Sequence, residues 1–277
     1  MDNDILYESI LESAQYLKEK MPVIPSHAIV LGTGLGNMMH GLEIIKEIAY
    51  RFIPHFVPTT VESHQGKLIL AKWQNKPILI FSGRMHYYEG YNLQEVTYPI
   101  RVLNELGVKT IWITNASGAV NPDLKAGEIV FVEDHINFHP ENPLRGISDP
   151  RLGDRFPDMS KVYDIGFLKL AKTACDSINY PFRKMIYFGL QGPSLETPAE
   201  YRMIRMLGGD IVGMSSVPEA IVAHQCGMRI MTVSVVSNDT PENGSSEKTT
   251  IESVIATIQN SSKTLFTILE YMMVHFN

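Results

Sequence analysis

The stretch FSGRMHYYEGY at residues 81–91 continues an apolar run, PILI, that is typical of a buried strand. Arg84, His86 and Tyr88 stand two residues apart, and in extended backbone such residues point to the same side. Since open α/β sheets bind ligands at the carboxyl ends of their strands, we expect the three side chains to face one pocket. The forked guanidinium of arginine suits a tetrahedral oxyanion, so the stretch predicts an anion site, most simply for phosphate, beside an aromatic wall. The competing interpretation is a surface ion pair between Arg84 and Glu89, with the aromatic rings in the core.

Composition limits the classes of protein to consider. The chain has 277 residues, of which 44% are hydrophobic and 19% charged, as in ordinary globular proteins. A net charge of −6 argues against a general nucleic-acid-binding surface, so an anionic ligand must be held by a local cluster. Cys175 and Cys226 are the only cysteines and form no CxxC motif, which predicts neither a disulfide framework nor a cysteine metal site. The sequence shows no signal peptide and no apolar run of membrane-spanning length, so we expect a cytoplasmic protein that binds neither nucleic acid nor membrane.

Strands alternate with helices along the chain. Helices are predicted at residues 4–20, 93–106, 164–179, 199–207, 217–226 and 251–272. Strands are predicted at residues 27–31, 77–81, 109–114, 128–132, 184–190, 210–214 and 229–237, with further short strands between residues 44 and 82. This alternation predicts an α/β fold with a largely parallel sheet and helices on both faces. Since no internal repeat or linker interrupts it, we expect a single domain spanning residues 1–277.

Three loops are further candidates for a functional role. LGTGLG at residues 31–36 lets the backbone approach an anion closely, and Thr33 adds a hydroxyl, although the spacing is not that of a dinucleotide-binding fingerprint. His64 lies in a polar turn, where either a role in the site or simple solvation is possible. Residues 135–163 form a long loop rich in Pro, Gly, Asp and Arg, which indicates a functional lid, a partner-contacting loop or disorder. No metal site is predicted there, because its histidines have no carboxylate or cysteine at a tight spacing.

The residues at the predicted strand ends combine into one site with polar groups and one apolar contact, Met214. They are Thr33, Arg84, His86, Asn115, Glu196, Met214, Ser215 and Asn238. The carboxylate of Glu196 accepts from N–H groups and the amide of Asn238 donates and accepts, a pair that suits a planar heterocycle such as a 6-oxopurine. The alternatives are that Glu196 caps the helix at 199–207 and that Met214 belongs to the core.

Taken together, these motifs resemble those of the trimeric purine nucleoside phosphorylases, the low-molecular-mass class that acts on inosine and guanosine. The resemblance runs from about residue 26 to 238 and is carried, in the family's order, by LGTGLG (31–36), VESHQGK (61–67), GRMHYYEGY (83–91), TNASGAVNPD (114–123), DHINFHPENPLRG (134–146), RFPDMS (155–160), GPSLETPAEYR (192–202) and GMSSVPEAIVA (213–223). It implies a single α/β domain with a mixed, partly barrel-like sheet, a homotrimer, and reversible phosphorolysis of purine (2′-deoxy)ribonucleosides to free base and α-(deoxy)ribose 1-phosphate, as in purine salvage. Inorganic phosphate is then a co-substrate, and no organic cofactor or metal is implied.

The resemblance also implies residue roles. Phosphate would be bound by Thr33, Arg84, His86, Ser215 and the backbone at Ala116, with His64 close to phosphate and sugar. The ribose would meet Tyr88 and Met214, and Phe156 of a neighbouring subunit would cover it. The base would lie against Ala116 and Leu195, with Glu196 accepting from N1–H and Asn238 hydrogen-bonding O6 and N7. In this scheme the catalytic residues are Asn238, Glu196 and His86.

Three positions depart from the best-known members of the family. Leu195 replaces a phenylalanine that packs against the base, and Asp239 replaces a lysine found in mammalian members. Ile251 takes the place of the histidine that usually contacts the 5′-hydroxyl, which opens the possibility of 5′-deoxy or 5′-thio substrates. The close alternative is therefore a 5′-methylthioadenosine phosphorylase. A nucleoside-binding module without catalysis and a nucleosidase that uses water are further alternatives.

Overall fold

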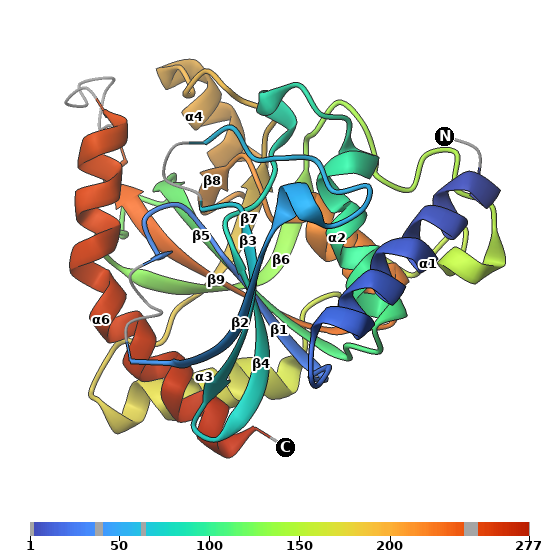
Figure 1. Cartoon of the computed structure of the whole chain (residues 1–277). Helices are drawn as coiled ribbons and strands as arrows, with labels where there is room; N and C mark the ends of the chain where they lie inside the picture. The colour runs from blue at the N-terminus through green and yellow to red at the C-terminus, as the bar shows by residue number, and fades with distance from the viewer. Residues whose placement is uncertain (1–2, 37–40, 62–64, 241–248, 277) are drawn as a thin grey trace.

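A mixed nine-stranded sheet forms the centre of the computed structural model, which describes residues 3–36, 41–61, 65–240 and 249–276 (Figure 1). Its strands are β1 (His27–Leu31), β2 (Glu43–Ala49), β3 (Lys67–Trp73), β4 (Lys76–Ser82), β5 (Thr110–Ala119), β6 (Ile129–Asn137), β7 (Lys184–Gly189), β8 (Ile211–Gly213) and β9 (Arg229–Asn238). The hydrogen-bonded order is β2-β3-β4-β1-β5-β8-β7-β6-β9, and an additional pairing of β5 with β9 closes the last five strands on themselves. The predicted α/β fold with a mixed, partly barrel-like sheet is confirmed.

Helices cover both faces of the sheet (Figure 1). They are α1 (Asn3–Lys20), α2 (Leu93–Glu105), α3 (Ile165–Ser177), α4 (Pro198–Met206), α5 (Val217–Gln225) and α6 (Ile251–His275). Helices α1, α2 and α5 pack together on one face, whereas α3 and α6 pack together on the other. Among the described residues, no helix combines the length and the apolar character that a membrane crossing requires.

The two faces have separate cores because successive side chains of a strand point to opposite sides. In β1, Ala28 and Val30 pack with the α1 and α2 side, whereas Ile29 and Leu31 pack with the α3 and α6 side. Neighbouring β4 divides its residues in the same way. Strands buried on both faces are continuously apolar, which is why β1 and β4 stand out in the sequence.

Two segments extend beyond their predicted bounds. The strand predicted to end before Asn115 continues to Ala119, because Ala116 and Ser117 still pair with Val235 and Val236 of β9. The long loop predicted from residue 135 begins later, since β6 runs to Asn137. Within it lie two short 3-10 helices, Pro150–Leu152 and Met159–Lys161.

His27, the first residue of β1, is a buried histidine in an apolar setting. Its ring lies 4.6 Å from that of Trp112 and 4.8 Å from that of Phe276, centroid to centroid. Within the described part of the chain, neither ring nitrogen has a hydrogen-bond partner. Burial, assisted by the charges of Lys76 and Arg229, lowers the pKa of His27 to about 3.

This histidine should make stability depend on pH. The unfolded chain takes up a proton near pH 6.5, but the folded protein does so only near pH 3. The free energy of unfolding should therefore fall as the pH drops through this window, with His27 contributing a loss of about 2 kcal/mol at pH 5. We expect His27→Leu to lose less stability than the original chain between pH 7 and pH 5, as measured by urea unfolding. His275→Gln, at an exposed position, is the control, and equal pH dependence in all three proteins would contradict the assignment.

Candidate active site

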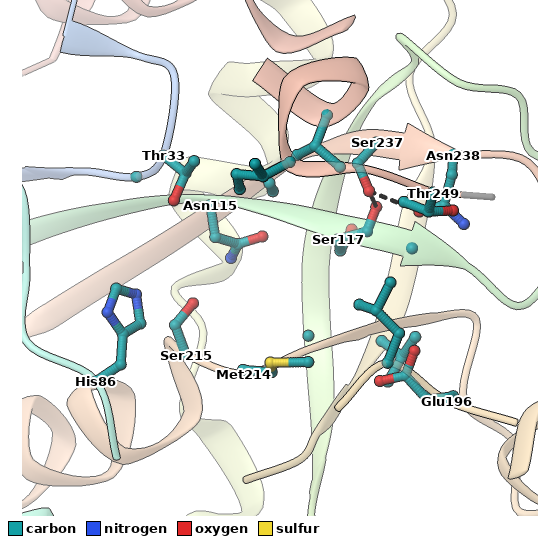
Figure 2. A pocket seen from close by; sticks show the side chains of 18 of the residues that line it. Thr33, His86, Asn115, Ser117, Glu196, Met214, Ser215, Ser237, Asn238 and Thr249 are labelled. Carbon is teal, nitrogen blue, oxygen red and sulfur yellow. Dashed lines mark hydrogen bonds between the residues drawn. The ribbon is translucent and has the colours of Figure 1, made fainter. Parts of the chain in front are cut away.

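One pocket at the end of the sheet gathers most of the predicted site residues (Figure 2). Its lining includes Thr33, Arg84, His86, Tyr88, Ala116, Leu195, Glu196, Met214, Ser215 and Asn238. Figure 2 shows Thr33, His86 and Ser215 at one end and Glu196 and Asn238 at the other, with Met214 between them. His64 lies outside the described residues. The pocket therefore brings together the predicted anion-binding and base-binding groups.

The anion end begins at the turn after β1. A side chain at Gly32 would stand 2.7 Å from the carbonyl oxygen of Thr114 and 2.8 Å from Cα of Asn115, so only glycine lets the two strands approach this closely. The Gly32 N–H donates to the Thr114 hydroxyl at 3.0 Å. The next residue, Thr33, lines the pocket.

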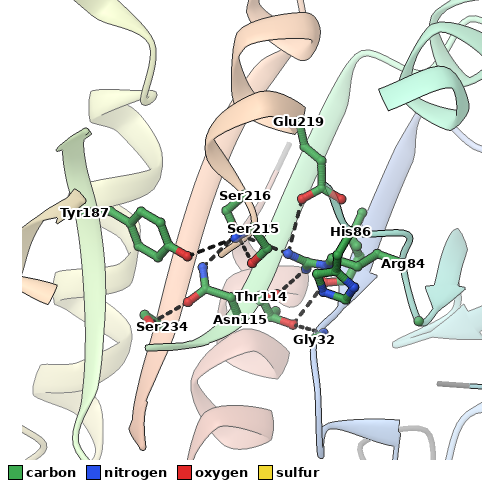
Figure 3. A network of polar contacts seen from close by, with 12 residues as sticks. Gly32, Arg84, His86, Thr114, Asn115, Tyr187, Ser215, Ser216, Glu219 and Ser234 are labelled. Atoms are coloured by element: carbon green, nitrogen blue, oxygen red, sulfur yellow. Dashed lines mark hydrogen bonds and ion pairs between the residues drawn. The ribbon is translucent and has the colours of Figure 1, made fainter. Parts of the chain in front are cut away.

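Arg84 is held from behind by buried partners (Figure 3). Its Nη1 lies 3.1 Å from a carboxylate oxygen of Glu219 and donates to the Ser216 hydroxyl at 3.1 Å, while Nη2 donates to the carbonyl of Thr114. The side chains of Arg84 and Glu219 are only 3% and 5% exposed. The alternative of a surface pair between Arg84 and Glu89 is wrong, because the partner is Glu219 and the pair is buried.

Glu89 instead orients His86. One Glu89 oxygen lies 2.9 Å from His86 Nδ1 and accepts from the His86 backbone N–H at 2.7 Å. The other accepts from the backbone N–H and hydroxyl of Thr60 at 2.5 and 2.7 Å. Burial acts to raise the pKa of Glu89, but these hydrogen bonds outweigh it and lower the pKa to about 2, so the carboxylate is ionised. For His86 the effect of burial has the opposite sign, because burial lowers the pKa of a histidine; the hydrogen bond to Glu89 opposes this shift.

Tyr88 reaches the pocket by a different backbone path from the one predicted. The extended backbone gives way to a 3-10 helix at Tyr87–Glu89, so the two-residue spacing does not carry through to Tyr88. Its ring instead stacks on His86, with centroids 4.6 Å apart and planes at 15°. The three side chains still line one pocket, as predicted.

A buried polar network supports the floor of the pocket (Figure 3). Asn115 donates to Ser216 at 2.8 Å and accepts from Ser234 at 2.5 Å. Ser216 has φ +64°, outside the usual regions for serine, and this turn presents the neighbouring Ser215 to the pocket. Asn115 is itself part of the pocket lining, and its two hydrogen bonds tie it to the surrounding scaffold.

At the base end, Glu196 is not a helix cap. The N-cap of α4 is Thr197, which accepts from the Glu200 N–H at 3.3 Å, while Glu200 accepts from the Thr197 N–H at 2.6 Å. Glu196 therefore lines the pocket, and Met214 likewise faces the pocket rather than the core. Burial raises the pKa of Glu196, and hydrogen bonding from the backbone and from Tyr201 opposes this rise.

Asn238, the last residue of β9, lines the same end of the pocket as Glu196 (Figure 2). Its Oδ1 accepts from the Ser237 hydroxyl at 2.7 Å, so the amide nitrogen points away from that hydroxyl. The next residue, Asp239, accepts from the backbone N–H of Ala126 at 2.6 Å and so ties the end of β9 to a neighbouring loop.

Tyr201 and Glu219 are among the polar residues of this region that had no predicted role. Tyr201 lines the pocket from α4, and although it lies in the segment GPSLETPAEYR (192–202), nothing in that segment distinguished it in advance. Glu219 did leave a signal, since it is a lone carboxylate within the apolar run Val217–Ala223 and such a group needs a buried partner.

Two further predicted positions occupy different surroundings. Ile251, the first residue of α6, lines the pocket together with Thr249 and Val254. Phe156 is 86% exposed, in contact with the guanidinium of Arg155, and is not part of the pocket lining in its own chain. In the described part of the chain, no group of three or more His, Cys, Asp or Glu residues is placed to hold a metal ion.

Comparisons with known proteins agree with this geometry. A family model described as the phosphorylase superfamily matches residues 26–273. Purine nucleoside phosphorylase 1 of Geobacillus stearothermophilus is 44% identical over 83% of this chain and 84% of its own, and the mouse purine nucleoside phosphorylase is 41% identical over 86% and 84%. Isoform 2 of the Schistosoma mansoni enzyme, in complex with cytosine and ribose-1-phosphate, superposes with a TM-score of 0.92 at 36% identity over 98% and 97% of the two chains. A Schistosoma mansoni purine nucleoside phosphorylase bound to adenosine gives a TM-score of 0.91 at 32% identity over 98% of both chains.

The fold and the pocket thus define a protein of the phosphorylase superfamily, and within it the chain belongs to the purine nucleoside phosphorylases.

Proposed function

We propose that this protein catalyses the reversible phosphorolysis of 6-oxopurine nucleosides, inosine and guanosine and their 2′-deoxy forms, to the free base and α-(deoxy)ribose 1-phosphate. The observation that carries the proposal is one pocket lined by Arg84, His86, Glu196 and Asn238. Figure 2 shows His86 at one end of this pocket and Glu196 and Asn238 at the other. Inorganic phosphate is the co-substrate in this scheme. The space between the two ends, beside Met214, would hold the sugar.

At the anion end, phosphate would be bound by Thr33, Arg84, His86, Ser215 and the backbone at Ala116. Since Glu219 and Glu89 fix Arg84 and His86, these donors need little reorganisation when phosphate enters. As the glycosidic bond breaks, the sugar gains oxocarbenium character, and the phosphate beneath it supplies the negative charge that stabilises it. Phosphate then attacks C1′ from the face opposite the base, so the configuration inverts.

At the base end, the leaving purine gains electron density. Asn238 would donate to O6 and N7 as this charge develops, and Glu196 would accept from N1–H and from the exocyclic amine of guanine. A 6-aminopurine offers a lone pair at N1 instead of a proton, so an ionised Glu196 would face it unfavourably. A buried mismatch of this kind discriminates by ~10⁴ or more, which disfavours a 5′-methylthioadenosine phosphorylase.

The decisive experiment is a substrate panel of inosine, guanosine, adenosine and 5′-methylthioadenosine, each with and without phosphate. We expect phosphate-dependent release of hypoxanthine and guanine, with ribose 1-phosphate as the second product. Release of free ribose would indicate a nucleosidase, and an absence of turnover would indicate a binding module. Cleavage of only the thioether substrate would overturn the substrate assignment.

The assembly belongs to the same proposal. It is a homotrimer in which Phe156 covers the ribose in a neighbouring subunit's site. The Phe156 ring is 86% exposed in one chain and is therefore open to such a contact. Sedimentation analysis is the direct measurement of the oligomeric state.

The 5′ end of the sugar should be recognised weakly. Ile251 offers no hydrogen bond to a 5′-hydroxyl, so 5′-deoxyinosine should be cleaved with a kcat/KM close to that of inosine. Ile251→His adds a donor at the pocket wall, and one hydrogen bond of ~0.5–1.5 kcal/mol should raise the preference for inosine by about 2- to 10-fold. The measurement is the ratio of kcat/KM for the two nucleosides. If the unmodified protein prefers inosine by more than about 100-fold, the difference is larger than one hydrogen bond can supply, and weak recognition of the 5′ end is contradicted.

A further inference from the structure

Tyr201 contributes a phenol to the base end of the pocket. It lies in the first half of α4, on the helix that starts directly after Glu196. The side chain is partly buried and lines the pocket together with Glu196 and Asn238. The roles proposed above leave it unused.

The start of α4 aims Tyr201 at this end of the pocket. Thr197 and Glu200 form a reciprocal capping box, with Pro198 at the first helical turn, so the helix begins at a fixed point. The side chains of Thr197 and Glu200 accept from each other's backbone N–H groups, so the capping box does not use the Glu196 carboxylate. Tyr201 then follows on the next turn of the same helix.

The phenol oxygen lies beside Asn238. A side-chain carbon built at Gly118 would be 3.1 Å from the Tyr201 hydroxyl and 3.3 Å from Asn238 Oδ1, so both atoms stand over the same glycine. Glu196 lines the same pocket, and the two groups lie close enough to affect each other: the charge of Glu196 raises the pKa of Tyr201, and Tyr201 opposes the rise in the pKa of Glu196. The base end therefore contains an acid, a phenol and an amide side by side.

The phenol has one proton to donate and two neighbours to receive it. Asn238 Oδ1 already accepts from Ser237 at 2.7 Å, whereas the Glu196 carboxylate is the stronger acceptor. Burial, together with the charge of Glu196, raises the pKa of Tyr201 to about 12, so the hydroxyl keeps its proton. A donor at this point favours the charged form of Glu196, which burial alone would disfavour.

We propose that Tyr201 is a positioning residue for base recognition, which donates to Glu196 and holds its carboxylate anionic and aimed at the N1–H edge of a 6-oxopurine. This inference rests on the proposed phosphorolysis of 6-oxopurine nucleosides. It assigns Tyr201 to the selection of the base and leaves phosphate binding to the other end of the pocket.

Packing alone does not need the hydroxyl. The Tyr201 ring packs against the small apolar cluster of Val120, Phe188, Ile204 and Val212, and a phenyl ring fills the same space. Tyr201→Phe therefore keeps this packing and removes only the oxygen. Thermal unfolding of the variant verifies that the fold is intact.

The test compares Tyr201→Phe with the original enzyme. We expect the KM for guanosine and inosine to rise about tenfold or more, from the loss of a charge-assisted hydrogen bond, with the KM for phosphate nearly unchanged. The acidic limb of the kcat/KM profile for guanosine should move to higher pH, because Glu196 without its donor binds a proton more readily. An unchanged KM and an unchanged acidic limb would overturn the inference.

A double-mutant cycle with Glu196→Gln separates this role from a general one. If Tyr201 acts through the carboxylate, Tyr201→Phe should cost much less in the Glu196→Gln background than in the original enzyme. Additive losses would overturn the inference. If the original enzyme shows no phosphate-dependent cleavage, the proposed function fails. If it does, and Tyr201→Phe has the same KM and acidic limb as the original enzyme, only the role of Tyr201 fails.

Discussion

Phosphate saturation is expected to be largely lost when Arg84 is replaced by glutamine. The guanidinium is the group in the pocket best suited to a bidentate contact with an oxyanion. A charged hydrogen bond contributes ~1.5–3 kcal/mol, so the KM for phosphate should rise at least about 10- to 100-fold. The measurement is the initial rate of inosine cleavage as a function of phosphate concentration.

The single variant has a second effect that needs a control. Its partner Glu219 is buried, and a carboxylate left without its cation at such a site destabilises the fold by about 3–5 kcal/mol. Arg84→Gln combined with Glu219→Gln removes both charges, so most of this stability should return in urea unfolding. Phosphate use should not return, because the guanidinium is still missing. Ordinary phosphate saturation in the folded double variant would contradict the assigned site.

This protein has a net charge of −6, so its proposed phosphate site must rely on local hydrogen-bond donors rather than on a general positive charge. Each basic group of the proposed phosphate site has its own carboxylate, Glu219 for Arg84 and Glu89 for His86. The carboxylates offset most of the positive charge, so recognition depends on donors held in a fixed arrangement. Such an arrangement favours a ligand of the right shape over anions in general.

The sequence was most informative where one local rule governs the structure. Continuous apolar runs identified β1 and β4, and the turns after the strands identified many of the residues that line the pocket. The prediction that Arg84 and His86 line one pocket is confirmed for the same reason, because both follow β4 before the chain turns into a 3-10 helix.

Long-range partners were not predictable by the same rules. Glu219 lies far from Arg84 in the sequence, and the pairing depends on how α5 packs beside the end of β4. The contribution of Tyr201 depends on where α4 is placed relative to β9, which no periodicity encodes. The continuation of β5 past Asn115 arises from pairing with β9, so polar and small residues there are strand rather than turn. Each of these facts comes from tertiary packing.

Asn238→Ala is expected to reduce kcat for inosine about 10²- to 10³-fold, the usual cost of removing one donor aimed at transition-state charge. Its amide would donate to the purine as the glycosidic bond breaks, so the loss should fall on the chemical step. The KM for phosphate should change little, because the phosphate site lies at the other end of the pocket. Pre-steady-state or single-turnover rates of hypoxanthine release measure this step directly.

A substrate with an activated leaving group provides the control for this variant. In 7-methylguanosine the base already carries a positive charge, so it departs as a neutral molecule and needs no donor at N7. Asn238→Ala should therefore lose far less activity on 7-methylguanosine than on guanosine, whereas a variant that merely distorts the pocket should lose both alike. Equal losses on the two nucleosides would show that Asn238 shapes the pocket without stabilising the leaving base, and the catalytic assignment would then have to pass to another group at the base end.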